Sequence, residues 1–195
     1  MQQLEKLTIE HIRALRPCYD PIKYIGSDWT GTLIDVLKTA HVPAQDRIWV
    51  VTGFLNQKTQ RLFAVFCARQ ILKTLGDCTE ALEAIDVAEK YAHCEASAYK
   101  LDSAKDRMRT ILRVLNTSSA ITAQSETEII ACNVACWCAQ DYVSAYTHKL
   151  ISQASNITEG DYVSDSVFLQ DQIDELLRML GESIEAPPLV QYEEK

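Results

Sequence analysis

Cysteine and histidine bind metal ions readily, and three cysteines of this sequence lie close to one histidine. Cys132, Cys136 and Cys138 belong to a stretch with helical periodicity, and His148 follows them. Structural zinc sites place their cysteine pairs on turns. On a helix, residues i and i+4 share a face whereas residue i+6 points away, so the three thiols cannot converge. We therefore predict small buried side chains, with no metal and no cofactor.

A single cysteine could instead act as a nucleophile, and Cys67 is the candidate. It lies between Phe66 and Ala68 in an apolar helix, where burial raises the pKa of a thiol and leaves little thiolate. The carboxylates show no spacing that is typical of a general acid–base pair, and the six glycines are too scattered for a phosphate-binding loop. The sequence predicts a protein that is not an enzyme. A metal ion or a deep pocket around His11, His41 or His148 would contradict this prediction.

The elements that carry these residues are predicted to be helices. The chain has 195 residues, 47% of them hydrophobic, and no proline between Pro43 and Pro187. We predict an all-α fold, an irregular antiparallel bundle of about seven or eight helices. One domain is expected over residues 1–181, followed by a mobile acidic tail over 182–195. The predicted helices span 8–16, 29–40, 44–54, 57–75, 79–93, 98–115, 126–152 and 166–180.

The densest apolar stretch, residues 46–72, is predicted to form the centre of the fold. Asn56 has the side chain of an N-cap for helix 57–75, and Gly76 stands just past its end. Helices 44–54 and 57–75 are expected to pair as a helical hairpin. The predicted structural core includes Trp49, Leu62, Phe63, Phe66, Cys67, Arg69 and Tyr91.

Arg69 is a charged residue inside this apolar helix. A buried arginine requires a partner, and Asp86 or Glu89 would supply one if helix 79–93 packs against helix 57–75. In the alternative, the aliphatic stem packs on the core while the guanidinium reaches water. The sequence leaves both arrangements open.

The start of the chain and its hydropathy predict a cytoplasmic protein. The first residues, MQQLEK, have neither the basic nor the apolar region of a signal peptide. The sequence contains no apolar run of about 18 residues, so no membrane span is expected. Seven cysteines are an odd number, and reduced thiols fit them better than a disulfide framework.

The net charge of −8 is concentrated at one end of the chain. Acidic and basic residues balance over 1–158, whereas 159–195 contains ten acidic residues against Arg178 and Lys195. Such a segment repels nucleic acid and attracts a basic protein. A solvated helix face followed by a frayed tail explains the same charges without a partner. The predicted partner-binding residues are Asp161, Asp165, Asp171, Asp174 and Glu175.

Several stretches occur in an order that is typical of one family: LTIEHIRALRPCYD, TGTLIDVL, DRIWVVTGFL, RLFAVFCAR and AIDVAEKYA. The sequence thereby resembles the α-helical immunity proteins found beside bacterial polymorphic toxins and in phages (immunity family five). Two motifs carry most of the likeness, Arg-Leu-Phe-Ala-x-x-Cys-Ala-Arg at residues 61–69 and Val-Ala-Glu-x-Tyr-Ala at 87–92. The resemblance covers residues 1–115 well and omits the acidic C-terminal segment. It implies a protein that binds and neutralises another protein without catalysis.

Two functions remain open at this point. In the first, an inhibitor or immunity-type protein binds a toxin or another defence-related protein, and the acidic segment attracts that basic partner. In the second, a phage or mobile-element protein blocks a nucleic-acid-handling complex, because its acidic surface imitates phosphates. The second predicts binding that depends strongly on salt concentration.

Overall fold

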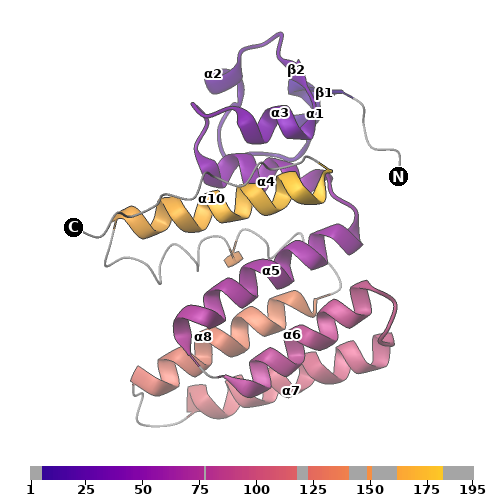
Figure 1. Ribbon diagram of the computed structural model, residues 1–195, viewed down its shortest axis with the longest axis vertical. Helices are drawn as coiled ribbons and strands as arrows, with labels where there is room; N and C mark the ends of the chain where they lie inside the picture. Colours follow the sequence, from indigo (N-terminus) through magenta and orange to yellow (C-terminus); the bar gives the residue numbers. More distant parts are fainter. Residues whose placement is uncertain (1–5, 77, 118–122, 141–148, 151–161, 182–195) are drawn as a thin grey trace, which may run out of the picture.

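Helices account for most of the chain, so the predicted all-α class is confirmed. Within the described residues of the computed structural model, eleven helices and strands are defined, and two of them are the two-residue strands of a small sheet (Figure 1). The helices fall into two groups along the chain, an N-terminal lobe and a four-helix bundle, and one further helix lies between the groups. The structure describes residues 6–76, 78–117, 123–140, 149–150 and 162–181, without the side chains of 123–124 and 162–166.

The N-terminal lobe contains short elements around an antiparallel strand pair. Its elements are β1 (Leu7–Thr8), α1 (Ile9–Ala14), α2 (Ile22–Ile25), β2 (Thr30–Gly31), α3 (Leu33–Lys38) and α4 (Ala44–Phe54). Strand β1 pairs with β2, and Leu7 lies opposite Gly31. A Cβ on Gly31 would lie 2.7 Å from the Trp29 ring, so the close approach of that ring requires glycine.

The prediction of one helix over 29–40 was wrong. The chain is extended at β2, and helix α3 begins only after Thr32. Thr32 and Asp35 form a capping box: the Thr32 N–H donates to Asp35 Oδ2 at 2.7 Å, and the Asp35 N–H donates to Thr32 Oγ1 at 3.2 Å. These two bonds satisfy backbone donors at the helix start, so they fix the N-terminus of α3 at this position.

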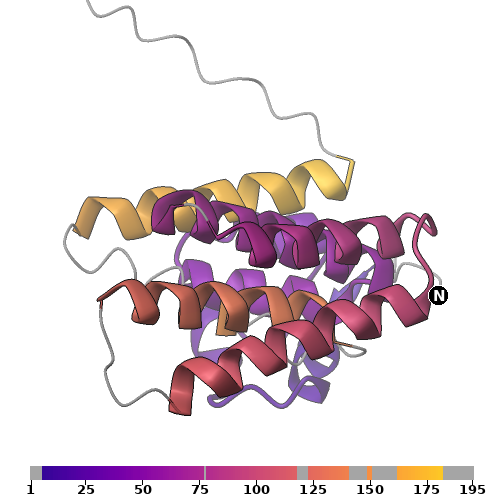
Figure 2. The ribbon, with the colours of Figure 1, turned by 90° about the horizontal axis from the view of Figure 1, so that it is seen from below.

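Four helices form the bundle: α5 (Gln57–Leu75), α6 (Thr79–Ala92), α7 (Ala98–Thr117) and α8 (Ala123–Cys138). Helix α6 packs against the other three, and α8 does the same. The predicted caps of α5 are confirmed, because Asn56 Oδ1 accepts the Thr59 N–H at 3.0 Å and Gly76 has a φ of 93°. Seen from below, α7 and α8 lie nearest the viewer (Figure 2).

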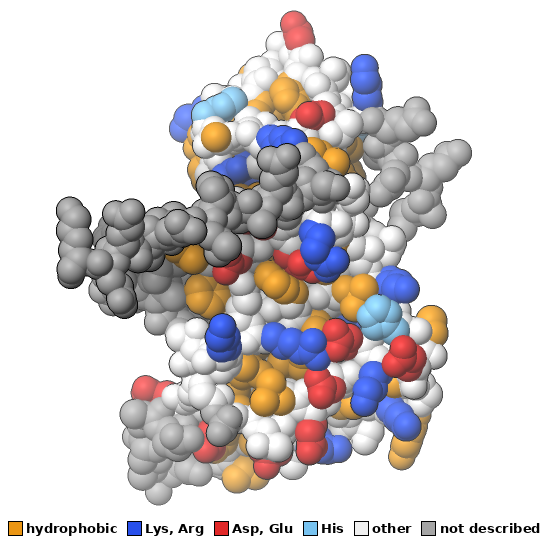
Figure 3. Space-filling view, viewed as in Figure 1, with side chains coloured by type: hydrophobic (Ala, Val, Ile, Leu, Met, Phe, Trp, Pro, Cys, Tyr) orange, Lys and Arg blue, Asp and Glu red, His pale blue; other side chains and the backbone are white. Residues whose placement is uncertain are grey.

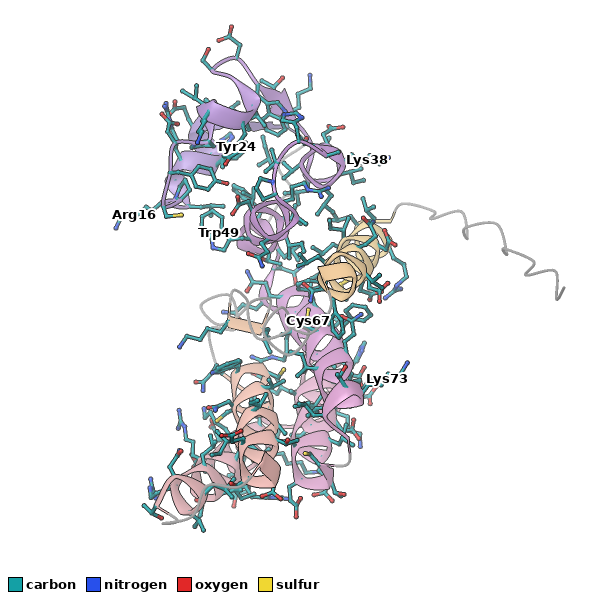
Figure 4. All side chains as sticks on the ribbon, turned by 90° about the vertical axis from the view of Figure 1, so that its left-hand side faces the viewer. Arg16, Tyr24, Lys38, Trp49, Cys67 and Lys73 are labelled. Atoms are coloured by element: carbon teal, nitrogen blue, oxygen red, sulfur yellow. The ribbon has the colours of Figure 1, made fainter. Side chains whose placement is uncertain are left out.

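The predicted hairpin of helices 44–54 and 57–75 does not form. Leu55 and Asn56 both have extended backbone conformations, with ψ of 152° and 161°, so the chain leaves α4 without reversing onto it. Helix α4 packs on α3, whereas α5 packs on α6 and α8. Trp49 lies on the side of α4 that faces away from α10 (Figure 4). The predicted pairing of helices 44–54 and 57–75 was therefore wrong.

Helix α10 (Tyr162–Met179) connects the lobe and the bundle, because it packs on α3 and α4 on one side and on α5 on the other. It begins before the predicted start at 166. Gly181, with a φ of 89°, follows its end as predicted. The predicted helix 126–152 was too long at its C-terminal side, since α8 ends at Cys138. Residues 149–150 are helical, and the other residues of 141–152 lie outside the described part of the chain.

Buried apolar side chains form one continuous cluster through the lobe, the bundle and α10. Phe63 and Cys67 of α5 are fully buried, as the sequence predicted for both. On α7 the buried stripe includes Leu101, whereas Tyr99 is 81% exposed. No helix within the described residues has the length and hydropathy needed to cross a membrane.

One polar side chain inside this core is unsatisfied. Gln172 of α10 is fully buried, and neither its Nε2 nor its Oε1 has a hydrogen-bond partner among the residues that the structure describes. A buried amide without partners costs about 1–3 kcal/mol. We expect Gln172→Met, which keeps the length of the side chain, to raise the free energy of unfolding by about 1 kcal/mol in urea denaturation.

A matched substitution controls for the amide itself. Gln170 is exposed on the same helix and donates to Asp174 Oδ1 at 2.7 Å, so Gln170→Met should leave the free energy of unfolding nearly unchanged. If Gln172→Met destabilises the protein instead, the buried amide has a partner and its burial is not a cost.

Candidate functional site

A groove between α5, α6 and α10 is lined by both apolar and charged residues and has a volume of about 680 Å³. We call it the α5–α10 groove. Its apolar side chains are Leu62, Val65, Phe66 and Met179, and the space-filling view of this face shows apolar side chains interspersed with charges of both signs (Figure 3). The other lining residues are Thr59, Arg69, Gln70, Lys73, Glu89, His93, Glu175 and Arg178.

The predicted partners of Arg69 are confirmed at one side of this groove. Arg69 Nη2 lies 2.8 Å from Asp86 Oδ1 and 2.6 Å from Glu89 Oε2, so this residue holds α5 and α6 together. The Arg69 side chain is also 43% exposed, so the guanidinium reaches water as well. Arg69 therefore belongs to the surface of the groove and not to the core. Its exposed ion pairs contribute little to the free energy of unfolding.

The predicted acidic residues of α10 are all engaged within the chain where the structure describes them. Asp171 Oδ2 accepts from Gln70 Nε2 at 3.2 Å, and Asp174 accepts from Gln170. Asp161 and the side chain of Asp165 lie outside the described residues. Asp171 and Asp174 therefore accept hydrogen bonds from neutral amides and keep their negative charge, whereas Glu175 is ion-paired.

Glu175 is the predicted residue that enters the groove. Its side chain is only 13% exposed, and it forms two bonds with Arg178, at 2.5 Å and 2.8 Å. Hydrogen bonding to Glu175 raises the pKa of the Arg178 guanidinium. This bidentate pair fixes the two side chains along the α10 side of the groove.

Two residues of the groove with basic side chains, Lys73 and His93, were not predicted, and neither has an ionic partner in the part of the chain that the structure describes. Neither Lys73 of α5 nor His93, which follows α6, forms an ion pair or a side-chain hydrogen bond with any residue that the structure describes. Lys73 projects from α5 on the side of the molecule where α10 lies (Figure 4). The groove thus combines an apolar floor with the unmatched positive charge of Lys73.

The remaining predicted core residues lie at the edges of the core. Leu62 and Phe66 are half-buried because they line the groove, and Trp49 is half-buried on α4. Tyr91 is also half-buried, with its ring 5.1 Å from the guanidinium carbon of Arg61. Of the seven residues predicted for the core, only Phe63 and Cys67 are fully buried.

Arg61 is a structural residue that the sequence interpretation missed. It is 4% exposed, and its guanidinium donates to the carbonyl oxygens of Cys138 at 2.6 Å and Gln140 at 2.9 Å. The C-terminal end of a helix carries partial negative charge and unsatisfied carbonyl groups. Arg61 therefore satisfies the end of α8. The available signal was a second charge in the apolar helix that contains Arg69.

The cysteines that were considered for metal binding or catalysis are buried and lie mainly in apolar surroundings. Cys67, Cys132, Cys136 and Cys138 are at most 5% exposed. Burial raises the pKa of Cys132 to about 11 and that of Cys138 to about 12, so both are thiols at neutral pH. The Cys138 Sγ donates to the Ala64 carbonyl at 3.4 Å. His148 lies outside the described residues, within which no cluster of metal-binding side chains occurs.

A second cavity, in the N-terminal lobe, is too small for a ligand. It has a volume of about 30 Å³ and is lined by aromatic and aliphatic residues that include Tyr19, Tyr24 and Trp29. Burial and a hydrogen bond to Asp46 raise the pKa of Tyr19 above its usual range. A volume of this size corresponds to about one or two water molecules.

The chain was also compared with protein-family models, with curated proteins and with solved structures, and no match was found in any of the three comparisons. The resemblance to immunity family five therefore stays a prediction from the sequence motifs, and the α5–α10 groove is the site that the geometry itself provides.

Proposed function

We propose that this protein is a non-enzymatic binding protein of the inhibitor or immunity type, which neutralises a basic toxin or another defence-related protein. The observation that carries the proposal is the distribution of charge. Residues 1–158 are neutral overall, so the whole net charge of −8 comes from residues 159–195. A charge gradient of this kind steers a basic partner toward one end of the chain and accelerates its association.

The packing of α10 supports a role for this end of the chain. Ile173 and Leu176 are buried, and the helix is packed against both the lobe and the bundle. The acidic segment 182–195 therefore continues from a helix whose position is fixed. A rigid attachment point reduces the conformational entropy that is lost when a partner is bound.

The state of the thiols supports a role without catalysis. A thiol nucleophile needs a lowered pKa and access to substrate. Burial instead raises the pKa of Cys67 well above its usual value, and the Cys67 side chain is fully buried. We assign the cysteines of the bundle to packing.

Partner capture with matched charge variants tests the proposed function. Tagged protein is used as bait in a lysate of the native host, and a captured partner is purified for affinity measurements between 50 and 500 mM NaCl. We expect a basic protein whose affinity falls at least about tenfold over this range. Replacing Glu185, Glu193 and Glu194 by glutamine should weaken binding by a similar factor.

The control variant makes the same change in net charge at another place. Glu80, Glu95 and Glu126 are exposed residues of the bundle, and their replacement by glutamine should leave the affinity within about twofold of the wild-type value. Equal affinities for the two triple variants would contradict the proposal, as would a host lysate that yields no partner. A captured polymerase or nuclease complex would favour the second function, the block of nucleic-acid handling.

A further inference from the structure

The α5–α10 groove has the chemistry of a site for an extended acidic and apolar segment. Leu62 and Phe66 provide half-buried apolar surface, Lys73 provides a positive charge without an ionic partner among the described residues, and His93 provides a polar ring. Peptide-binding grooves use apolar pockets for anchor side chains and charges at the rim for orientation. A suitable occupant therefore has apolar residues flanked by carboxylates.

The C-terminal segment of the same chain has this composition. Residues 182–195 read ESIEAPPLVQYEEK, so Leu189, Val190 and Tyr192 lie between Glu185 and Glu193, and Ile184 lies between Glu182 and Glu185. Pro187 and Pro188 reduce the number of conformations open to the unbound segment, which lowers the entropy lost on docking.

The segment also starts beside the groove. Met179 and Arg178 line the groove, and residue 182 follows them after Gly181. Fourteen extended residues span at most about 45–50 Å, whereas α5 between Thr59 and Lys73 is about 21 Å long. The segment can therefore follow the groove over its whole length. Because it is tethered, its effective concentration at the groove is in the millimolar range.

We propose that residues 182–195 dock into the α5–α10 groove of their own chain, with the aliphatic side chains on Leu62 and Phe66 and the glutamates beside Lys73 and His93. Arg69 and Arg178 keep their present partners, Glu89 and Glu175, so they contribute positive charge only at the rim. The docking itself does not depend on the proposed function.

One consequence does rest on the proposed function. A basic partner that binds the glutamates must first remove them from Lys73 and His93, so the groove competes with the partner for the same segment. The observed affinity is then reduced by the fraction of molecules in which the segment is docked. Substitutions in the groove that release the segment would increase the affinity for the partner.

The rate of cleavage by a glutamate-specific protease tests the docking in the full-length chain. A docked segment is cleaved only when it dissociates, so the rate reports the open fraction. We expect Lys73→Glu to increase the rate of cleavage within residues 182–194 by about fivefold or more, because it places like charges together. Leu189→Asp should have a similar effect through the loss of an apolar anchor.

The control is Lys100→Glu, an equal charge reversal at an exposed position of α7, which should leave the cleavage rate unchanged. Circular dichroism verifies that each variant retains its helices. Equal rates for the wild type, Lys73→Glu and a synthetic peptide of residues 182–195 would overturn the proposal. A wild-type rate that falls as the protein concentration rises would also overturn it, because the segment would then dock onto a second copy.

A carbodiimide, which joins lysine to carboxylate without a spacer, provides an independent readout on the native chain. We expect cross-links between Lys73 and the glutamates of residues 182–194, at a yield that does not depend on protein concentration. Cross-links distributed equally over Lys73, Lys100 and Lys58 would contradict docking. These experiments use no partner, so their failure is distinct from a failure of the proposed function.

Discussion

Replacement of Phe63 by alanine is expected to lower the free energy of unfolding by about 3–5 kcal/mol, the largest effect that we predict for a single side chain. Phe63 is fully buried on α5 and belongs to the continuous core. Removal of its ring eliminates a large apolar contact area and leaves a cavity that rigid neighbouring helices cannot fill. Urea denaturation, followed by circular dichroism at 222 nm, measures the change.

Phe66 provides a matched control three residues away on the same helix. It is half-buried because it lines the α5–α10 groove, so Phe66→Ala removes a smaller buried area and should cost roughly half as much as Phe63→Ala. An equal loss for the two variants would show that Phe66 is covered as fully as Phe63. Cleavage of residues 182–194 in Phe66→Ala then reports whether that cover is the C-terminal segment.

Replacement of Arg61 by methionine has the second largest expected effect, a loss of about 3 kcal/mol. The substitution retains most of the aliphatic stem, but it leaves the buried Cys138 carbonyl and the partly buried Gln140 carbonyl without their charged donor. We expect the loss to be concentrated at the end of α8. Hydrogen exchange of the α8 amides, together with urea denaturation, measures the local and global changes.

The second arginine of α5 is the control for this prediction. Arg69 pairs with Asp86 and Glu89, yet its side chain is 43% exposed, so Arg69→Met should cost only about 0.2–1 kcal/mol. Arg61→Lys should recover part of the stability, because one ammonium group can replace some but not all of the guanidinium bonds. A loss for Arg69→Met that exceeds the loss for Arg61→Met would contradict this account.

Features that depend on nearby residues could be predicted from the sequence. Asn56 and Gly76 mark the ends of α5 because caps act within a few residues of a helix terminus. The partners of Arg69 could be inferred because α5 and α6 are consecutive helices joined by a short connection. The all-α class follows from periodicity and from the small number of helix-breaking residues.

Features that depend on distant parts of the chain could not be predicted in this way. Apolar periodicity shows that α4 has a buried face, but it does not show that α10, more than a hundred residues later, covers that face. The hairpin prediction failed for this reason. The break of the expected helix 29–40 could have been predicted, because Thr32 and Asp35 have the spacing of a capping box.

The candidate site was the feature that the sequence predicted least well. The α5–α10 groove joins residues of three helices, and neither Lys73 nor His93 belongs to a local motif. The acidic residues of α10 were identified by charge alone, which does not reveal that Gln70 and Arg178 already bind two of them. Charge patterns give the sign of a surface, whereas hydrogen bonds within the fold decide which charges are unpaired.

The position of α10 has a consequence for the order in which the protein folds during translation. The N-terminal lobe leaves the ribosome first, but the helix that covers α3 and α4 is synthesised after the whole bundle. The apolar face of α4 is thus uncovered while about a hundred further residues are made, and its final contacts require closure of a long loop. Exposed apolar surface of this kind binds chaperones and promotes aggregation. A ribosome that stalls before Tyr162 would release a chain whose bundle can fold but whose N-terminal lobe lacks its cover.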